Sequence, residues 1–246
     1  MNNSNEHLVS VIMSAYNHAP YVGAAIESVL SQTYKNIEFL ITDDGSSDGT
    51  IEEIKKSKDT RIHFHSSGVN RGACTAINEL ISMARGKYLC IINSDDIWCD
   101  QDKIKKQLRI LESQSEIGAT FGRARYIDSE GNDLDKKTLP EGNIFDQENR
   151  ARYEWLKHFF IYGNCICHPT IMIRKECYDQ LGGYKNSFRQ LPDLDMWIRL
   201  TKKYELYVSK DEFVAFRILP GQNASSPTRT NLIRHLNEFH TIRRSF

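Results

Sequence analysis

The chain has 246 residues, 40% hydrophobic and 26% charged, which is enough to form a packed core in one large α/β domain or two small ones. Lysine plus arginine equals aspartate plus glutamate, at 32 each, so the basic excess typical of nucleic-acid binders is missing and we expect no nucleic-acid partner. No apolar run approaches the ~20 residues of a membrane span, and residues 1–5 are polar, unlike a signal-peptide core. We therefore expect a cytoplasmic protein whose six cysteines stay reduced.

The first half of the chain alternates apolar runs with amphipathic stretches. The apolar runs predict strands at 8–14, 37–42, 61–65 and 88–92. Apolar residues at helical spacing predict helices at about 20–30, 51–57 and 70–83, and Gly86 is expected to end the last one. Strict alternation of strand and helix predicts a doubly wound, mostly parallel α/β sheet flanked by helices.

The second half is less regular. In chain order we expect a helix at 102–113, a strand at 119–127, a polar mobile loop at 132–150, a helix at 153–161, a strand at 170–174, a helix at 194–203 and short strands at 206–208 and 213–217. An amphipathic helix follows, with an apolar face formed by Leu232, Ile233, Leu236 and Phe239. No clear linker interrupts these elements, so we expect one domain.

Three predicted strands carry polar groups at their ends, in residues 14–17, 43–44 and 95–96. Because the carboxyl ends of parallel strands share one edge, these residues can line one crevice. Adjacent carboxylates such as Asp95 and Asp96 are costly at the end of a buried strand unless a cation joins them. A hard divalent ion whose shell is completed by a ligand's phosphates fits them, and the alternative is a pair of loop aspartates that begin a turn. A nucleotide would suit such a crevice.

Eight short segments occur in register over most of the chain: 9–17, 28–34, 43–50, 70–72, 86–88, 94–98, 182–184 and 193–200. Any one of them would be a weak signal. Together they resemble the family 2 glycosyltransferases, which are inverting enzymes of the GT-A fold. The resemblance therefore implies a GT-A fold and a transferase.

The resemblance also implies roles for the matching residues. The implied donor-binding residues are Ser14, Ala15, Tyr16, Asn17, Asp44, Arg71 and Asp95. Asp44 would accept a hydrogen bond from the base of a UDP-type donor, and Asp95 would lie near the ribose or sugar. Asp96 would ligate Mn²⁺ or Mg²⁺, and Asp193 would be the general base.

The implied activity is metal-dependent, inverting transfer of a sugar from a nucleotide sugar, UDP-linked by this resemblance, to a hydroxyl acceptor in glycan, polysaccharide or glycolipid synthesis. The cation would neutralise the leaving diphosphate, and a carboxylate would deprotonate the acceptor, so no enzyme nucleophile is needed. Residues 1–246 would form a single GT-A domain. It would have a nucleotide-binding half at about 8–98, an acceptor-binding half at about 99–220 and a C-terminal helix at about 229–246.

Several polar residues have plainer explanations. Asp43 is expected to start the Asp-Gly turn, and Asp48 to cap the next helix. If the segment is already helical, Asp195 points to a different face from Asp193, so only one of them can serve the acceptor. Arg71 could meet a phosphate or be a solvated surface charge.

The segment 165–168 contains Cys165, Cys167 and His168. This spacing could suggest zinc, but no second pair lies at finger-like spacing, so buried cysteines are the preferred interpretation. His168 could approach the donor phosphates or be structural.

The chain departs from the family pattern at two positions. Pro192 stands where the family often has glutamate before the base, and Leu219 stands where many members have histidine. These departures motivate the alternative of a non-catalytic sugar-nucleotide-binding or partner subunit. A nucleotidyltransferase ranks lower, because no glycine-rich phosphate loop follows the first strand.

The C-terminal helix is basic as well as amphipathic, with Arg229, Arg234, Arg243 and Arg244. Packing on the domain is the default expectation. The alternatives are contact with a membrane that carries a lipid-linked acceptor, at its cytoplasmic face, and pairing with a second copy.

Overall fold

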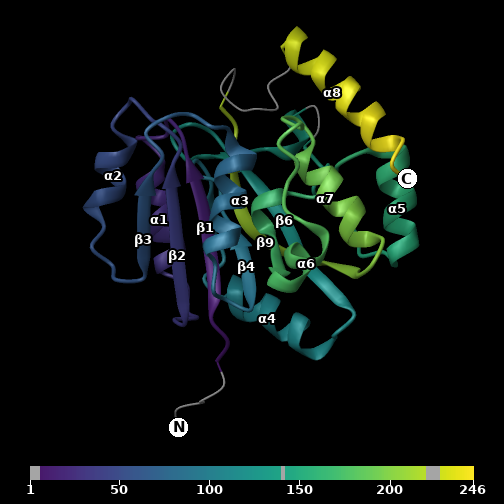
Figure 1. The fold of residues 1–246 in the computed structure, drawn as a ribbon, viewed down its shortest axis with the longest axis horizontal. Helices are drawn as coiled ribbons and strands as arrows, with labels where there is room; N and C mark the ends of the chain where they lie inside the picture. Colours follow the sequence, from purple (N-terminus) through teal and green to yellow (C-terminus); the bar gives the residue numbers. More distant parts are fainter. Residues whose placement is uncertain (1–5, 140–141, 220–227) are drawn as a thin grey trace.

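The structure is a computed structural model that describes residues 6–139, 142–219 and 228–246. Within these ranges, one nine-stranded sheet carries helices on both faces (Figure 1). The strands are β1 (Val9–Ala15), β2 (Ile37–Asp43), β3 (Ile62–Ser66), β4 (Tyr88–Ile91), β5 (Ile97–Trp98), β6 (Ile117–Ile127), β7 (Asp133–Leu134), β8 (Met172–Arg174) and β9 (Glu205–Arg217). The helices are α1 (Val22–Leu30), α2 (Thr50–Lys56), α3 (Ala73–Met83), α4 (Lys103–Ser113), α5 (Arg152–Tyr162), α6 (Lys175–Leu181), α7 (Pro192–Thr201) and α8 (Arg229–Arg243).

The sheet has the order β3-β2-β1-β4-β8-β6-β9-β5, and β7 pairs with β6. The first four strands of this order are parallel, whereas β8 runs antiparallel to both its neighbours. The chain leaves β1 toward β2 and later returns to β4 on the other side of β1. The order therefore reverses between β1 and β4, and open α/β sheets bind ligands at the carboxyl ends of the strands at such a point. The predicted α/β sheet flanked by helices is confirmed.

Two apolar layers pack on the two faces of the sheet. Along β1, Ile12 belongs to one layer and its neighbours Val11 and Met13 to the other, as the alternation of side chains along a strand requires. Helices α3, α5 and α7 cover the first face, and α1, α2 and α4 cover the second. The strand β2 is buried along its whole length, which explains why apolar side chains occur on both of its faces.

The prediction that Gly86 ends a helix is wrong. Helix α3 ends at Met83, and Ala84 is already extended. Gly86 instead lies against β1, where its N–H donates to Ser10 Oγ at 2.8 Å. A Cβ atom at this position would lie 2.5 Å from the backbone nitrogen of Ser10. Glycine is therefore required by close packing between backbones.

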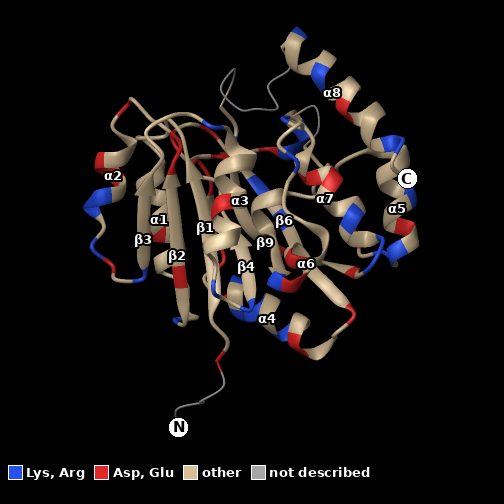
Figure 2. Cartoon of the chain, in the orientation of Figure 1, with Lys and Arg blue, Asp and Glu red and all other residues tan. Residues whose placement is uncertain are grey.

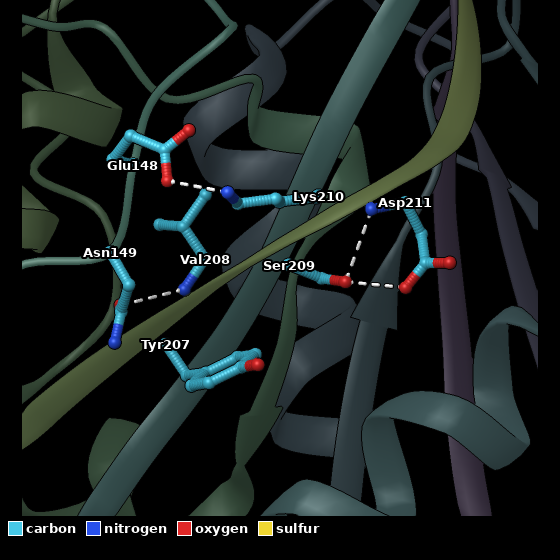
Figure 3. A pocket seen from close by; sticks show the side chains of 7 residues that line it. All are labelled: Glu148, Asn149, Tyr207, Val208, Ser209, Lys210 and Asp211. Atoms are coloured by element: carbon cyan, nitrogen blue, oxygen red, sulfur yellow. Dashed lines mark hydrogen bonds and ion pairs between the residues drawn. The ribbon is translucent and has the colours of Figure 1, made fainter.

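Residues 205–217 form one long strand, β9, where two short ones were expected. The polar residues in its middle suggested a turn, but β5 pairs with β9 only at Val214 and Ala215, so much of β9 lies at the edge of the sheet. The polar segment 132–150 contains β7 and a 3-10 turn, and its described residues reach β9. Figure 3 shows the shallow pocket between them, where Asn149 Oδ1 accepts the Val208 N–H at 3.0 Å and Glu148 pairs with Lys210. These contacts tie a segment that was expected to be a mobile loop to the sheet.

The apolar face expected to pack α8 on the domain points mostly away from it. Leu232, Ile233 and Leu236 are 54%, 51% and 66% exposed. The helix packs instead through Ile242, which joins the core, and through the buried carboxylate of Glu238. Helix α6 was not predicted. In the described ranges, no helix has the length and apolar character needed to cross a membrane.

Candidate active site

A cleft of about 450 Å³ opens at the carboxyl ends of β1, β2 and β4, where the strand order reverses. Its walls come from both halves of the chain. Residues of the first half that line it are Ser14, Tyr16, His18, Asp44, Asn70, Ala73, Cys74, Ile77, Ile92, Asn93, Ser94 and Asp95. Those of the second half are His168, Tyr184, Arg189, Gln190, Pro192 and Asp193.

The end of β1 supplies two lining residues and two that hold the loops. Ser14 and Tyr16 line the cleft, and the Tyr16 ring is 45% exposed. Ala15 is buried, and its carbonyl accepts the Asp44 N–H at 2.8 Å. Asn17 has a φ of 52°, a conformation that asparagine tolerates better than most residues, and its Oδ1 accepts the Ser47 N–H. These contacts fix the loop after β1 against the loop after β2.

Asp44 follows β2 and joins it to the start of α3. Its buried carboxylate accepts the backbone N–H groups of Arg71 at 2.9 Å and of Gly72 at 2.8 Å. Each carboxylate oxygen can accept more than one hydrogen bond, so Asp44 retains capacity toward the cleft. The Arg71 guanidinium pairs with Glu79 and does not line the cleft.

Asp95 and Asp96 follow β4 and differ in what surrounds them. Asp95 lines the cleft, and burial raises the pKa of its carboxyl against the opposing charge of His18. Asp96 lies behind it, where Oδ1 accepts the Arg217 N–H at 2.8 Å and Oδ2 accepts from Asn93 at 2.9 Å. Burial, and then the charge of Asp95, raise the pKa of Asp96 well above its ordinary value. Two adjacent buried carboxylates of raised pKa form a donor set that suits a hard divalent cation.

The described residues contain no group of three or more histidine, cysteine, aspartate or glutamate side chains that could hold a metal ion. A cation at Asp95 and Asp96 would therefore take its other ligands from water and from a bound phosphate, as Mg²⁺ commonly does. The turn that carries the pair is braced by Arg217, whose Nε donates to the Asp95 carbonyl at 2.8 Å. Leu219, two residues after the end of β9, is buried.

Asp193 lies across the cleft, at the start of α7. Pro192 occupies the first turn of α7, where a missing N–H costs nothing, so this departure from the family pattern leaves the helix start intact. The Asp193 carboxylate accepts from the Leu194 N–H at 2.8 Å and from Asn164 Nδ2 at 2.6 Å. Burial raises the pKa of this carboxyl to about 6, although these two hydrogen bonds oppose the rise. Asp193 is thus largely ionised at neutral pH and can still accept a proton.

Asp195 is held away from the cleft by two cations. Its buried carboxylate pairs with Lys185 at 2.6 Å and with Arg199 at 2.7 Å. The two aspartates therefore point to different faces, as expected for a helical segment, and Asp193 is the one that reaches the cleft.

The plainer explanations for Asp43 and Asp48 are confirmed. Asp43 Oδ2 accepts the N–H groups of Gly45 and Ser46 in the turn after β2. Asp48 accepts the Thr50 N–H at the first residue of α2, so its side chain holds the start of this helix from the position before the N-cap residue Gly49.

Cys165 and Cys167 are buried in the apolar layers, which confirms the preferred interpretation of buried cysteines, and burial raises the pKa of the Cys165 thiol to about 12. His168 lines the cleft and shares a hydrogen bond of 2.8 Å with the Tyr184 hydroxyl. Burial lowers the pKa of His168 to about 4, so the ring is neutral at physiological pH and offers a hydrogen bond to a ligand but no charge.

Sequence reasoning missed several residues of the cleft. His18 Nδ1 and Ser94 Oγ lie 2.7 Å apart, and both residues line the cleft with Asp95. Arg189 and Gln190 line the opposite wall. Ser94 opens the segment 94–98 that carried the family resemblance, and Gln190 lies three residues before Asp193; these positions are the signals that could have found them.

The sequence model described as Glycosyl transferase family 2 matches residues 10–176. The chain belongs to glycosyl transferase family 2. The predicted family and the predicted class, a glycosyltransferase, are confirmed. The match covers Asp44, Asp95 and Asp96 and ends before Asp193.

Curated relatives of this family 2 chain span most of its length. It is 43% identical over 199 residues, 80% of the chain and 71% of the relative, to "UDP-Glc:alpha-D-GlcNAc-diphosphoundecaprenol beta-1,3-glucosyltransferase WfaP" of Escherichia coli. It is 31% identical, over 89% of the chain and 82% of the relative, to "Putative teichuronic acid biosynthesis glycosyltransferase TuaG" of Bacillus subtilis.

Solved structures with the same fold include two transferases. TarS of S. aureus in complex with UDP-GlcNAc gives a TM-score of 0.72 at 16% identity, over 97% of this chain and 73% of that one. The mannosyltransferase PcManGT of Pyrobaculum calidifontis, in complex with GDP-Man and Mn²⁺, gives 0.67 at 16% identity, over 97% and 65%. Another TarS chain is covered only to 60% of its length. These likenesses confirm the predicted GT-A fold.

Proposed function

We propose that this family 2 chain is a metal-dependent inverting glycosyltransferase that moves a sugar from a UDP-sugar to a hydroxyl acceptor in polysaccharide, glycan or glycolipid synthesis. The observation that carries the proposal is the shared cleft, because Asp44 and Asp95 line one wall and Asp193, with its pKa of about 6, lines the other. The donor named for the Escherichia coli relative supports a UDP-sugar.

The donor would occupy the wall formed by the strand ends. We assign Ser14, Ala15, Tyr16, Asn17, Asp44, Arg71 and Asp95 to the donor site. Ser14, Tyr16, Asp44 and Asp95 can contact the donor directly because they line the cleft. Ala15 and Arg71 hold the loops through their backbone groups, and Asn17 holds them through its side-chain Oδ1.

Asp96 and Asp95 would hold Mn²⁺ or Mg²⁺. When bound, the cation neutralises the charge that develops on the leaving diphosphate. The pair itself supports this assignment, because binding a cation would remove the cost of holding two buried carboxylates side by side.

Asp193 would accept the proton of the acceptor hydroxyl as the hydroxyl attacks the sugar. General-base catalysis of this kind contributes about 10²–10⁴-fold. Asn164 and the Leu194 N–H orient the carboxylate, and its raised pKa makes it a stronger base than an exposed aspartate. Because the sugar is transferred in a single displacement, the anomeric centre would be inverted. Residues 99–220 would bind the acceptor. Residues 1–246 would form a single GT-A domain.

Thermal unfolding with UDP tests the donor site. A ligand at about 100 times its Kd stabilises the folded state by about 2.7 kcal/mol. We expect UDP to raise Tm in the presence of Mn²⁺ and not in the presence of a chelator. No shift with any nucleoside diphosphate, together with no transfer of sugar, would favour the non-catalytic partner subunit instead.

We also propose that α8 and the neighbouring α5 contact an anionic lipid surface. The helices touch through Arg243, whose Nε donates to the Phe160 carbonyl at 2.9 Å, and they lie side by side at one end of the molecule (Figure 1). Their exposed apolar side chains are Phe160, Ile161, Tyr162, Leu232, Ile233 and Leu236. Basic residues recur along α8 (Figure 2), and its only acidic residue, Glu238, is buried against the domain.

This charge favours anionic lipid over a second copy, because two such faces would repel each other, whereas each arginine near an anionic surface contributes about 1 kcal/mol. We expect co-sedimentation with phosphatidylglycerol vesicles and not with phosphatidylcholine vesicles. The double variant Leu232→Asp/Leu236→Asp should lose binding, and Met83→Asp, at an exposed apolar residue elsewhere, should keep it. Failure to bind phosphatidylglycerol, or a dimer that the double variant dissociates, would overturn this assignment. Binding to phosphatidylglycerol that the double variant loses would place the protein at the cytoplasmic face of a membrane.

A further inference from the structure

One carboxylate of α8 accepts hydrogen bonds from three successive backbone N–H groups. Glu238 Oε1 accepts from Arg189 at 2.9 Å, and Oε2 accepts from Gln190 at 2.8 Å and from Leu191 at 2.9 Å. The Glu238 side chain is 7% exposed, so water cannot replace it easily. These three residues, which we call the 189–191 turn, lead directly into α7.

The N-cap residue of α7 cannot itself accept these hydrogen bonds. Leu191 is the N-cap residue of α7, and its side chain cannot accept a hydrogen bond. N–H groups at the start of a helix need an acceptor from elsewhere, and negative charge there is favourable. Glu238, 47 to 49 residues further along the chain, provides both.

The turn carries much of the second wall of the cleft. Arg189 and Gln190 belong to the turn, Asp193 follows it by two residues, and all three line the cleft. A shift of the turn would therefore move a cation and the proposed base together. Catalysis is sensitive to such shifts, since a displacement of about 1 Å can cost about 10²-fold in rate.

We propose that Glu238 is a positioning residue for transfer, which fixes the 189–191 turn and thereby places Asp193 and Arg189 in the cleft. This inference rests on the proposed role of Asp193 as the base. It gives α8 a function in the site although no residue of α8 lines the cleft.

Electrostatics distinguishes positioning from a purely structural role. After burial, the charge of Glu238 contributes to the raised pKa of Asp193. The other titratable or charged groups around Asp193 are Cys74 of α3, Cys167 and His168 before β8, and Tyr184 and Arg189 of the segment between α6 and α7. Removing the negative charge of Glu238 should make Asp193 ionise at lower pH.

The test compares Glu238→Gln with Glu205→Gln. Glutamine has a similar size but offers one carbonyl oxygen to three donors. Glu205 accepts the Arg152 N–H at 2.8 Å, at the first residue of α5, so it is a matched carboxylate at a helix start away from the cleft. For Glu238→Gln we expect unchanged UDP affinity and a kcat reduced about tenfold. The midpoint of the dependence of kcat on pH should lie below the wild-type value. Glu205→Gln should keep kcat and its midpoint.

Hydrogen exchange at the amides of residues 189–191 gives a readout that does not depend on activity. Loss of a hydrogen bond to a charged group should speed their exchange about tenfold or more in Glu238→Gln and not in Glu205→Gln. If these amides stay protected, or if kcat and its midpoint stay at wild-type values, the inference is overturned. If exchange rises but the wild type transfers no sugar, the turn is held by Glu238 and the proposed function fails. Glu238→Asp, which keeps the charge, replaces Glu238→Gln if the latter does not fold.

Discussion

Asp193→Asn is expected to remove activity and to stabilise the folded protein. Burial raises the pKa of this carboxyl from 3.8 to about 6, so folding disfavours the ionised form. The shift corresponds to about 3 kcal/mol, at about 1.4 kcal/mol per pH unit. Because Asp193 is only half-buried, water screens part of this effect, and we expect a gain of about 1–2 kcal/mol in the free energy of unfolding near neutral pH. Asparagine keeps the shape and can still accept the Leu194 N–H.

Stability and activity depend on pH in opposite senses. Since the folded pKa lies above the unfolded one, the ionised carboxylate destabilises the protein fully above about pH 6 and not at all below about pH 4. The stability advantage of Asp193→Asn should therefore shrink as the pH falls from 6 toward 4. The kcat of the wild type should rise with pH through about 6 and then level off, because only the carboxylate accepts a proton.

Urea unfolding measures the change in stability, and UDP release from the sugar donor measures the change in activity. Asp195→Asn is the matched control. This substitution lies on the same helix but leaves Arg199 and Lys185 without their carboxylate. It should lose about 2–3 kcal/mol of stability and keep its activity while folded. Asp193→Asn should lose about 10²-fold or more in kcat. An Asp193→Asn enzyme within about tenfold of wild type, or one less stable than wild type at neutral pH, would refute the reasoning.

Three further substitutions test other parts of the site and fold. Asp96→Ala should abolish the Mn²⁺-dependent rise in Tm with UDP, and the surface variant Asp179→Ala should preserve it; persistence of the rise in Asp96→Ala would exclude Asp96 as a ligand. Arg189→Ala should leave UDP affinity unchanged by calorimetry and lower kcat/KM about tenfold, because the cation lies on the cleft wall opposite the donor residues, and weaker UDP binding would place its guanidinium on the donor side. Gly86→Ala should lower the free energy of unfolding by about 1–3 kcal/mol, because the new Cβ would meet the Ser10 backbone, and a wild-type urea midpoint would show that β1 can shift.

The donor wall of the cleft could be predicted from the sequence because its residues sit at strand ends. Ser14 lies near the end of β1, Asp44 and Asp95 follow β2 and β4, and the parallel sheet alone brings them to one edge. Local signals also sufficed for Asp43 and Asp48, since turns and helix caps depend on residues nearby in sequence.

Predictions failed where distant segments decided the outcome. Gly86 lies where a glycine often ends a helix, but the structure needs glycine there because its backbone packs against Ser10, which is distant in sequence. The polar residues in the middle of β9 separated two predicted short strands. They are tolerated in one long strand because this part of β9 lies at the edge of the sheet, and only the order of the strands reveals that. The apolar stripe of α8 correctly predicted an amphipathic helix, but the periodicity could not say which face meets the domain. Glu238 on the other face decides that.

The two walls of the cleft therefore rest on different kinds of contact. Strand geometry places the donor wall, and the family match over residues 10–176 covers it. Asp193 depends on Asn164 and on the 189–191 turn, which Glu238 holds from a helix outside that match. In the proposed mechanism, the first wall would recognise the transferred group and the second would activate the acceptor. Donor class should accordingly be shared with relatives of similar strand ends, whereas the placement of the base, and with it the acceptor that can react, depends on contacts made by α7 and α8.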